Sequence, residues 1–277
     1  QGAKLDKIQS LTGMLDLYED GDNTNLSSKI FETERRIKKI FSSYQLNEIR
    51  TPALEDTNLF KRSVGDVSDI VNKEIYSFND RNDKSIALRP EGTASVIRAI
   101  IEKKLDQSNH KLWYMGPMWR YERPQKGRYR QFYQAGIEIL GYKEGSPEFE
   151  MISIICSIIK EFNLQNCHIK INHLGSQENK EAYCKALTDY LAPFKDKLDS
   201  KDLERLTRNP LRVLDSKNEE TILLLKGAPS IKSFLEPSAL QLLEDIKNQF
   251  GDICSIEIDH SLVRGLDYYS GFVFEAI

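Results

Sequence analysis

Basic residues gather between two strand-like segments, "KLWYMGPMWRYE" and "RQFYQAGIEILGY". Residues 120–130 hold one acid, Glu122, and five basic residues, namely Arg120, Arg123, Lys126, Arg128 and Arg130. Guanidinium groups bind phosphate oxygens through two parallel hydrogen bonds. The sequence has no GxxxxGK[ST] loop. A nucleotide bound here would therefore have its phosphates held by arginines and metal ions rather than by a backbone nest.

Strand alternation predicts which side chains share a face with this loop, because residues two apart project from the same side of a strand. If the two segments pair, one face carries Arg120, Glu122, Phe132, Gln134 and Glu138 above Gly116 and Gly136. Phe132 could stack on a base, and the glycines would leave room for a flat ligand. The opposite face, which includes Trp113, Trp119, Tyr133 and Ala135, is predicted to be core.

Two further clusters could complete a site. Glu91 and Thr93, in "ALRPEGTAS", follow a predicted strand and precede a predicted helix, where a carboxylate and a hydroxyl could hold an ammonium group. "RGLDYYSG" supplies Arg264 to reach a phosphate, and the phenol hydroxyls of Tyr268 and Tyr269. Each cluster alone has a simpler explanation: "RPEGT" as a helix cap, the tyrosines as one core and one surface ring. Together they suit a ligand with phosphates, a base and an amino group.

Composition limits the other possibilities. The 277 residues carry a net charge of −3, so no global basic field draws the chain to nucleic acid. The four cysteines form no CxxC pair, and no signal peptide is visible, which predicts reduced thiols in a cytoplasmic protein. The four histidines lack metal-ligand spacing, so we expect no metal held by the protein alone. The longest apolar run is too short to span a membrane.

The elements that position these residues predict an α+β fold with a mostly antiparallel sheet flanked by helices. We expect helices over 27–44, 93–105 and 149–162, a hairpin over 74–91, and short strands over 168–175 and 254–259. The strand-like stretch near Pro52 is interrupted by that proline. A charged, helix-rich stretch separates two parts of one domain. The expected segments are 1–175, a helical insertion over 176–250, and a continuation over 251–277.

Four segments resemble the histidyl-tRNA synthetases, a family of class II aminoacyl-tRNA synthetases. They are "RTPALEDTNLFKRSVGDVSDIVNKEIYSFNDRNDKSIALRPEGTAS", "MGPMWRYERPQKGRYRQFYQAGIEILG", "NPLRVLDSK" and "LVRGLDYYSGFVFE". The likeness runs from about residue 30 to Ile277, and "RGLDYY" is its most specific part, similar to the family's histidine-specific motif. The second segment contains class II motif 2. The region around Pro52 looks like motif 1, which implies a homodimer.

The resemblance implies roles for the nucleotide-binding residues. Arg120 would contact the ATP α-phosphate and the substrate carboxylate, and Arg264 would press on the same phosphate, so these two are the implied catalytic residues. Glu122 would bind the adenine edge, and Phe132 would stack on that ring. Arg128 would hold the γ-phosphate. ATP would come with Mg²⁺, and no protein-bound cofactor is implied.

The resemblance also implies a histidine pocket. Glu91, Thr93 and Gln134 would hold the α-amino group of L-histidine. Glu138 and Tyr269 would bind the two imidazole nitrogens, with Tyr268 beside them. A site that hydrogen-bonds both nitrogens rejects apolar side chains strongly. The implied reaction forms histidyl-adenylate, passes the acyl group to tRNA(His), and releases AMP and pyrophosphate.

The sequence departs from the family in two places. Thr12 precedes Gly13 where the family has an arginine. Nothing matches motif 3, the second histidine motif or an anticodon-binding domain, so we expect a catalytic fragment that is weak or inactive in aminoacylation by itself.

Two alternatives compete with the synthetase interpretation. One is the synthetase-like regulatory subunit of ATP phosphoribosyltransferase, which shares the fold without catalysis; the presence of Arg120, Glu138 and Arg264 argues against it. The other is a general binder of single-stranded RNA, against which the net negative charge speaks.

Overall fold

The computed structural model describes residues 8–18, 26–64, 70–265 and 268–277. The chain divides into two compact units, Gln1–Tyr142 and Lys143–Ile277. Within the described residues, the strands form three three-stranded sheets, and four of the six strand pairs are antiparallel. These features confirm the predicted α+β class. No helix in the described part of the chain is long and apolar enough to cross a membrane.

The main sheet of the first unit has the order β1-β5-β6. Its strands are β1 (Asn47–Glu48), β5 (His110–Trp119) and β6 (Gln131–Leu140). β5 and β6 pair in antiparallel register, with Gly116 opposite Gln134 and Leu112 opposite Glu138. The register confirms the predicted pairing of these strands. Because β5 ends at Trp119, Arg120 and Glu122 belong to the connecting loop rather than to the strand.

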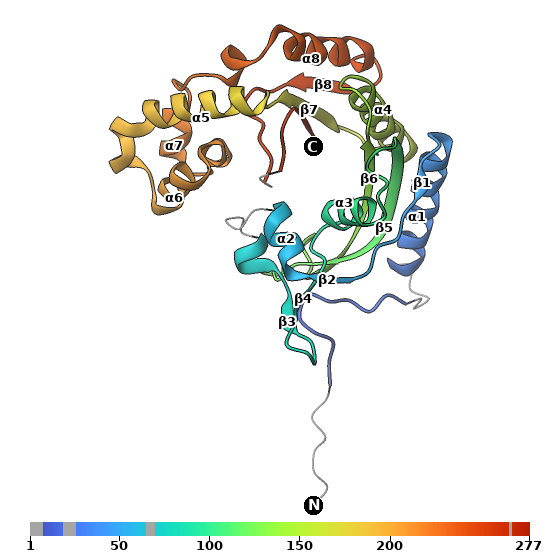
Figure 1. Ribbon diagram of the computed structural model, residues 1–277. Helices are drawn as coiled ribbons and strands as arrows, with labels where there is room; N and C mark the ends of the chain where they lie inside the picture. The colour runs from blue at the N-terminus through green and yellow to red at the C-terminus, as the bar shows by residue number, and fades with distance from the viewer. Residues whose placement is uncertain (1–7, 19–25, 65–69, 266–267) are drawn as a thin grey trace, which may run out of the picture. The chain divides into compact units, whose positions relative to one another are not determined.

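Helices cover both faces of this strand pair (Figure 1), with α1 (Leu26–Ser43) on one and α3 (Thr93–Glu102) on the other. On the α1 face, the ring of Phe41 lies 5.6 Å from that of Trp113. On the α3 face, Tyr114 and Met118 are buried in a cluster with apolar residues of α3.

The predicted division into a core face and a ligand face is therefore wrong in part. The ligand face holds part of the core, whereas Tyr133 on the expected core face is 45% exposed and Ala135 is also exposed. The reason is that α3 brings apolar side chains to one face, and α1 covers only part of the other. A cavity of about 280 Å³ remains between α1 and β6.

The predicted glycine floor is also corrected. A Cβ atom at Gly136 would lie 2.1 Å from Cζ of Tyr114, and one at Gly92 would lie 2.1 Å from Cε2 of the same ring. At Gly116, a Cβ atom would lie 2.9 Å from Nη2 of Arg89. These glycines therefore make room for the protein's own side chains. Alternation alone does not show what fills the space above a glycine.

The rest of the first unit is a smaller antiparallel sheet with its helices. Its elements are β2 (Leu54–Asp56), α2 (Thr57–Val64), the π-helix η1 (Ile70–Glu74), β3 (Ser77–Asn79) and β4 (Ser85–Leu88). β3 and β4 form the predicted hairpin. The chain is irregular between β1 and β2, as expected around Pro52.

The second unit is built on a sheet with the order β8-β7-β9. Its strands are β7 (His168–His173), β8 (Ser255–Ile258) and β9 (Phe272–Ala276). Helices α4 (Ser146–Glu161) and α8 (Pro237–Phe250) pack on it through buried residues such as Ile152, Ile169 and Leu243.

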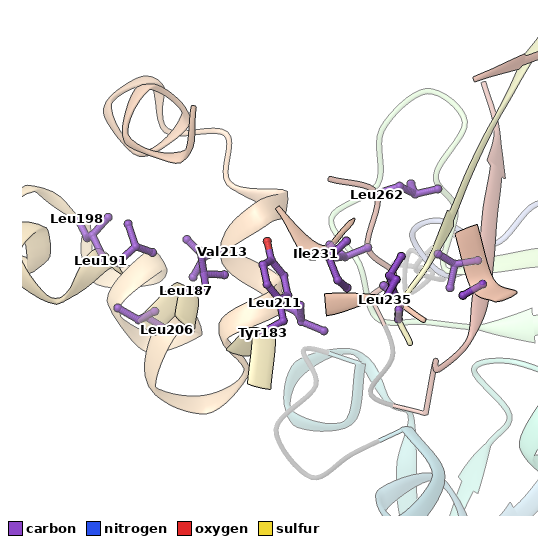
Figure 2. Close-up of a cluster of buried hydrophobic side chains, with 14 residues drawn as sticks. Tyr183, Leu187, Leu191, Leu198, Leu206, Leu211, Val213, Ile231, Leu235 and Leu262 are labelled. Atoms are coloured by element: carbon purple, nitrogen blue, oxygen red, sulfur yellow. The ribbon is translucent and has the colours of Figure 1, made fainter. Parts of the chain in front are cut away.

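Six helical elements lie between β7 and α8. They are α5 (Gln177–Leu191), η2 (Ala192–Lys197), α6 (Ser200–Arg208), η3 (Pro210–Asp215), α7 (Glu219–Leu225) and η4 (Ile231–Phe234), where η2, η3 and η4 are 3₁₀-helices. They enclose a core of Leu187, Leu191 and Val213, all 0% exposed, shown in Figure 2. Leu262 and Val263, from the segment before "RGLDYY", belong to the same core. These six elements, called the helical insertion below, thus pack directly on that segment.

Candidate active site

The best-defined group in the first unit is the pair Thr93 and Glu138. Thr93 stands at the first position of α3, and Glu138 lies near the end of β6. The hydroxyl of Thr93 donates to Oε1 of Glu138 at 2.6 Å. Burial raises the pKa of Glu138 to about 7, while the Thr93 hydrogen bond opposes the shift and the charge of Glu91 adds to it. Glu138 can therefore exchange a proton near neutral pH.

Glu91 caps the helix that carries Thr93. Its two carboxylate oxygens accept from the backbone N–H groups of Thr93 at 2.7 Å and Ala94 at 3.0 Å. Only 3% of Glu91 is exposed, and burial raises its pKa, while those hydrogen bonds and the charge of Arg120 lower it. The helix-cap explanation of "RPEGT" is confirmed. Each oxygen keeps a second lone pair, so the cap leaves capacity for a ligand's amino group.

Arg120 links the loop to this helix start. Its Nε donates to the carbonyl of Pro90 at 2.9 Å, one residue before Glu91. Its guanidinium carbon also lies 5.1 Å from the centre of the Phe132 ring. The arginine therefore lies over the Phe132 ring, which also packs against the buried cluster that includes Tyr114 and Met118. That a base stacks on this ring stays a prediction.

Arg128, the predicted phosphate ligand, forms an ion pair with Glu122, the predicted adenine ligand. Nη1 of Arg128 lies 3.5 Å from Oε2 of Glu122, and 65% of the arginine side chain is exposed. Exposed ion pairs contribute about 0–1 kcal/mol. Arg128 could therefore leave Glu122 and bind a phosphate at little cost in free energy.

Gln134 carries an unsatisfied acceptor. Within the described residues, its Oε1 atom is buried and no hydrogen-bond donor reaches it. A buried acceptor without a partner costs about 1–3 kcal/mol. Such an atom on the same face as Glu138 is suited to receive a donor from a ligand, such as the ammonium group predicted for this position.

Sequence reasoning missed two residues that shape the loop. The carbonyl of Gly13 accepts from the backbone N–H groups of Arg130 at 2.8 Å and Gln131 at 3.2 Å, and its φ of +78° favours glycine. Nη1 of Arg89 donates to the carbonyl of Thr51 at 2.7 Å, and Nε donates to Pro117 at 3.1 Å, which ties the segment around Pro52 to β5. The glycine after Thr12 was a signal for the first. Nothing in the sequence pattern indicates the second.

The remaining predicted residues lie in the second unit. Arg264 pairs with Glu275, with Nη1 3.1 Å from Oε1, and its guanidinium carbon lies 6.0 Å from the ring centre of Tyr269. The rings of Tyr268 and Tyr269 lie 4.9 Å apart. Tyr269 packs on the insertion core and Tyr268 is 36% exposed, which matches the simpler explanation of one core and one surface ring.

Only part of "RGLDYYSGFVFE" forms a strand, because β9 begins at Phe272. The first unit brings Glu91, Thr93, Arg120, Phe132 and Glu138 together through the contacts described above. That Arg264 and Tyr269 close over this group remains a prediction, since it joins residues of two units.

The antiparallel pair β5–β6 with its basic loop, beside a helix start bound by a buried glutamate, fits the class II aminoacyl-tRNA synthetase fold that the sequence resemblance implies. A sequence model described as Histidyl-tRNA synthetase matches residues 24–277. The chain belongs to the histidyl-tRNA synthetase family.

Curated relatives support this assignment. The chain is 46% identical over 246 residues to the histidine--tRNA ligase of Francisella philomiragia, covering 87% of this chain and 58% of that one. It is 43% identical over 249 residues to the enzyme of the same name in Limosilactobacillus fermentum, covering 88% and 58% of the two chains. The chain thus spans somewhat over half the length of these relatives.

Solved structures agree. Apo histidyl-tRNA synthetase of S. aureus matches with a TM-score of 0.74 and 32% identity, over 98% of this chain and 61% of that one. A protein titled ATP phosphoribosyltransferase regulatory subunit/histidyl-tRNA synthetase, from Bacillus halodurans, matches with a TM-score of 0.66 and 19% identity, over 97% of this chain and 72% of that one. The second likeness concerns the fold alone.

Proposed function

We propose that the native protein containing this chain is a histidine--tRNA ligase. It activates L-histidine with ATP to histidyl-adenylate and passes the acyl group to tRNA(His). The observation that carries the proposal is Glu138: a chain of this family holds a glutamate with a pKa of about 7 beside a hydroxyl and a second buried carboxyl.

Glu138 suits an imidazole for a chemical reason. A neutral imidazole has one N–H donor and one acceptor nitrogen. A carboxyl group with a pKa near 7 can accept from the N–H as a carboxylate, or donate to the other nitrogen as an acid. Glu138 would bind one nitrogen and Tyr269 the other. Glu91, Thr93 and the unsatisfied Oε1 of Gln134 would hold the ammonium group.

ATP would lie along the loop between β5 and β6. Arg120 and Arg128 would bind its phosphates, Glu122 would bind the adenine edge, and Phe132 would stack on the adenine ring. Mg²⁺ would be held largely by the phosphates themselves. Among the described residues, no group of three or more His, Cys, Asp or Glu side chains could hold a metal ion.

The reaction needs position and positive charge rather than a protein nucleophile. A carboxylate oxygen of histidine attacks the α-phosphorus, a P–O bond forms, and the bond to the bridging oxygen breaks to release pyrophosphate. Arg120 and Arg264 would stabilise the charge that develops on the α-phosphate, and the pocket would keep the two reactants aligned.

We also propose that the protein is a cytoplasmic homodimer that pairs through the region around Pro52 and α1. Two exposed apolar side chains of this unit support the interface: Phe31 of α1 at 68%, and Tyr133 at 45%, which lines the cavity beside α1. The four free cysteines are consistent with a reducing compartment.

Exchange of labelled pyrophosphate into ATP, measured with the full native protein, tests the function. We expect exchange that requires L-histidine. Histidine binding without exchange would identify the regulatory-subunit alternative. Absence of both binding and exchange would exclude histidine activation.

A further inference from the structure

Strand β8 ends at Ile258 and β9 begins at Phe272. The described residues between them, which include Arg264 and the two tyrosines, form no helix or strand. Strand β7 holds both flanks of this segment. Nδ2 of Asn172 donates to the carbonyl of Leu262 at 3.0 Å, and the N–H of Leu174 donates to the carbonyl of Gly271 at 2.7 Å. The carbonyls of Gly265 and Tyr269, between these flanks, lie outside the strands and accept hydrogen bonds from side chains.

Two cationic side chains of the helical insertion donate these hydrogen bonds. Nη1 of Arg212, from η3, donates to the carbonyl of Gly265 at 2.5 Å. Nζ of Lys180, from α5, donates to the carbonyl of Tyr269 at 3.3 Å. Hydrogen bonds from charged donors are about twice as strong as neutral ones. Two separate elements of the insertion thus bind the chain at points next to Arg264 and Tyr268.

Arg212 is itself held in place. Its Nε lies 3.4 Å from Oδ2 of Asp215, one turn along the same 3₁₀-helix. Arg212 is followed directly by Val213, which is fully buried in the core of Figure 2. The guanidinium therefore lies beside the Asp215 carboxylate, although its Nε makes no hydrogen bond, and the buried Val213 anchors the backbone next to it. This assigns a use to "NPLRVLDSK", which none of the proposed substrate contacts explains.

The apolar contacts point the same way. Leu262 and Val263 are 7% and 6% exposed within the insertion core, and Tyr269 packs against it. The insertion and the chain around Arg264 therefore share one core, so a shift of the insertion moves that chain.

We propose that Arg212 and Lys180 are positioning residues for histidine activation. They bind the carbonyls of Gly265 and Tyr269, and thereby fix the placement of Arg264 and of Tyr269 itself. This inference rests on the proposed function of Arg264 and Tyr269. The helical insertion would then act in amino-acid activation, before any tRNA is bound.

The test uses Arg212→Met, which keeps the aliphatic stem and removes the donors, and Arg212→Lys, which keeps a cationic donor. Arg208→Met is the matched control, because Arg208 lies on α6 of the same insertion and pairs only at the surface with Glu204, with side chains 50% and 55% exposed. Two quantities are measured in the full native protein: the carbonyl ¹³C chemical shifts of Gly265 and Tyr269, which report the hydrogen bonds that these oxygens accept, and histidine-dependent pyrophosphate exchange.

We expect Arg212→Met to shift the carbonyl ¹³C resonance of Gly265, because its oxygen loses a donor. We also expect it to lower kcat/KM for histidine about 100-fold, since small misplacements of this kind cost rate factors of that order. Arg212→Lys should restore part of both, and Arg208→Met should change neither. The inference is overturned if Arg212→Met leaves either quantity at its wild-type value.

Arg212→Met could unfold the insertion, which faster amide hydrogen exchange throughout α5 would reveal. In that case Lys180→Met takes its place. Its control is Lys185→Met, an exposed lysine on the same helix that pairs with Asp189. Wild-type kinetics in Lys180→Met would then refute the inference. A wild-type protein without histidine-dependent pyrophosphate exchange would instead refute the proposed function, while the carbonyl chemical shifts would still report on the two hydrogen bonds.

Discussion

The two units hold their candidate functional side chains by different means. In the first unit, Thr93 and Glu138 stand on regular elements, the start of a helix and a ten-residue strand, and meet directly at 2.6 Å. In the second unit, Arg264 lies on an irregular segment, fixed by side chains from residues 53 and 89 positions away in sequence from the carbonyls they bind.

This difference has a consequence for how each region fails. Regular elements place side chains through their own backbone hydrogen bonds, so only a change at the site itself should disturb them. An irregular segment depends on donors from elsewhere, so distant substitutions such as Arg212→Met should reach it. The first unit should therefore respond to local changes, and the second to remote ones.

The largest effect is expected for Glu138→Gln. The amide keeps the shape of the side chain but loses the group that titrates near neutral pH, so histidine-dependent pyrophosphate exchange should fall about 10²–10³-fold in kcat/KM, the range for loss of one well-placed polar contact. Steady-state exchange at varied histidine concentration measures this.

The matched control is Glu102→Gln on α3, whose side chain is 67% exposed and paired with Arg98. It should leave exchange unchanged. If Glu138→Gln were fully active, there would be no reason to assign the imidazole to this carboxyl. The view that the first unit depends on local contacts at this site would then be wrong.

The same contrast explains what could be predicted from sequence. The pairing of β5 with β6, the hairpin around "NDRND" and helix α3 follow from local periodicity, which is visible in a single chain. Alternation predicts that Phe132, Gln134 and Glu138 share one face of the sheet, and the β5–β6 register confirms this placement.

Other features depend on contacts that no local pattern contains. Which face is covered depends on α1 and α3 arriving from other parts of the chain, so Tyr133 was misassigned to the core. Tyr114 fills the space above Gly136 because its ring turns across the strand pair. The bond from Arg212 to Gly265 spans 53 residues and has no signature in either segment.

Glu138 should also make the stability of the protein depend on pH. Burial raises its pKa in the folded state to about 7, above the ordinary value of 4.5. The folded state therefore binds a proton more tightly than the unfolded state, and the free energy of unfolding falls as pH rises from about 4.5 to about 7.

Glu138→Gln removes this dependence. The variant should be more stable than wild type at pH 8 by up to about 3 kcal/mol, with the difference shrinking toward zero below the unfolded pKa. Denaturant unfolding at pH 4.5, 6 and 8 measures the trend, with Glu102→Gln as the flat reference. A constant difference across this range would show that Glu138 does not titrate there. The variant would thus gain stability and lose activity, as expected of a strained functional group.

The smallest effect is expected on the stability of Gly136→Ala. It tests whether local contacts, here with the Tyr114 ring, determine the structure of the first unit. The Cβ atom of Gly136→Ala would lie 2.1 Å from Cζ of Tyr114 and 2.2 Å from its hydroxyl oxygen, so the ring or the strand must move. Overpacking of this kind costs about 1–3 kcal/mol of unfolding free energy. A double-mutant cycle with Tyr114→Ala separates the clash from other effects, because removing the ring should make Gly136→Ala nearly neutral. If the two substitutions instead destabilise additively, the glycine is needed for backbone reasons and the space above it is not set by Tyr114.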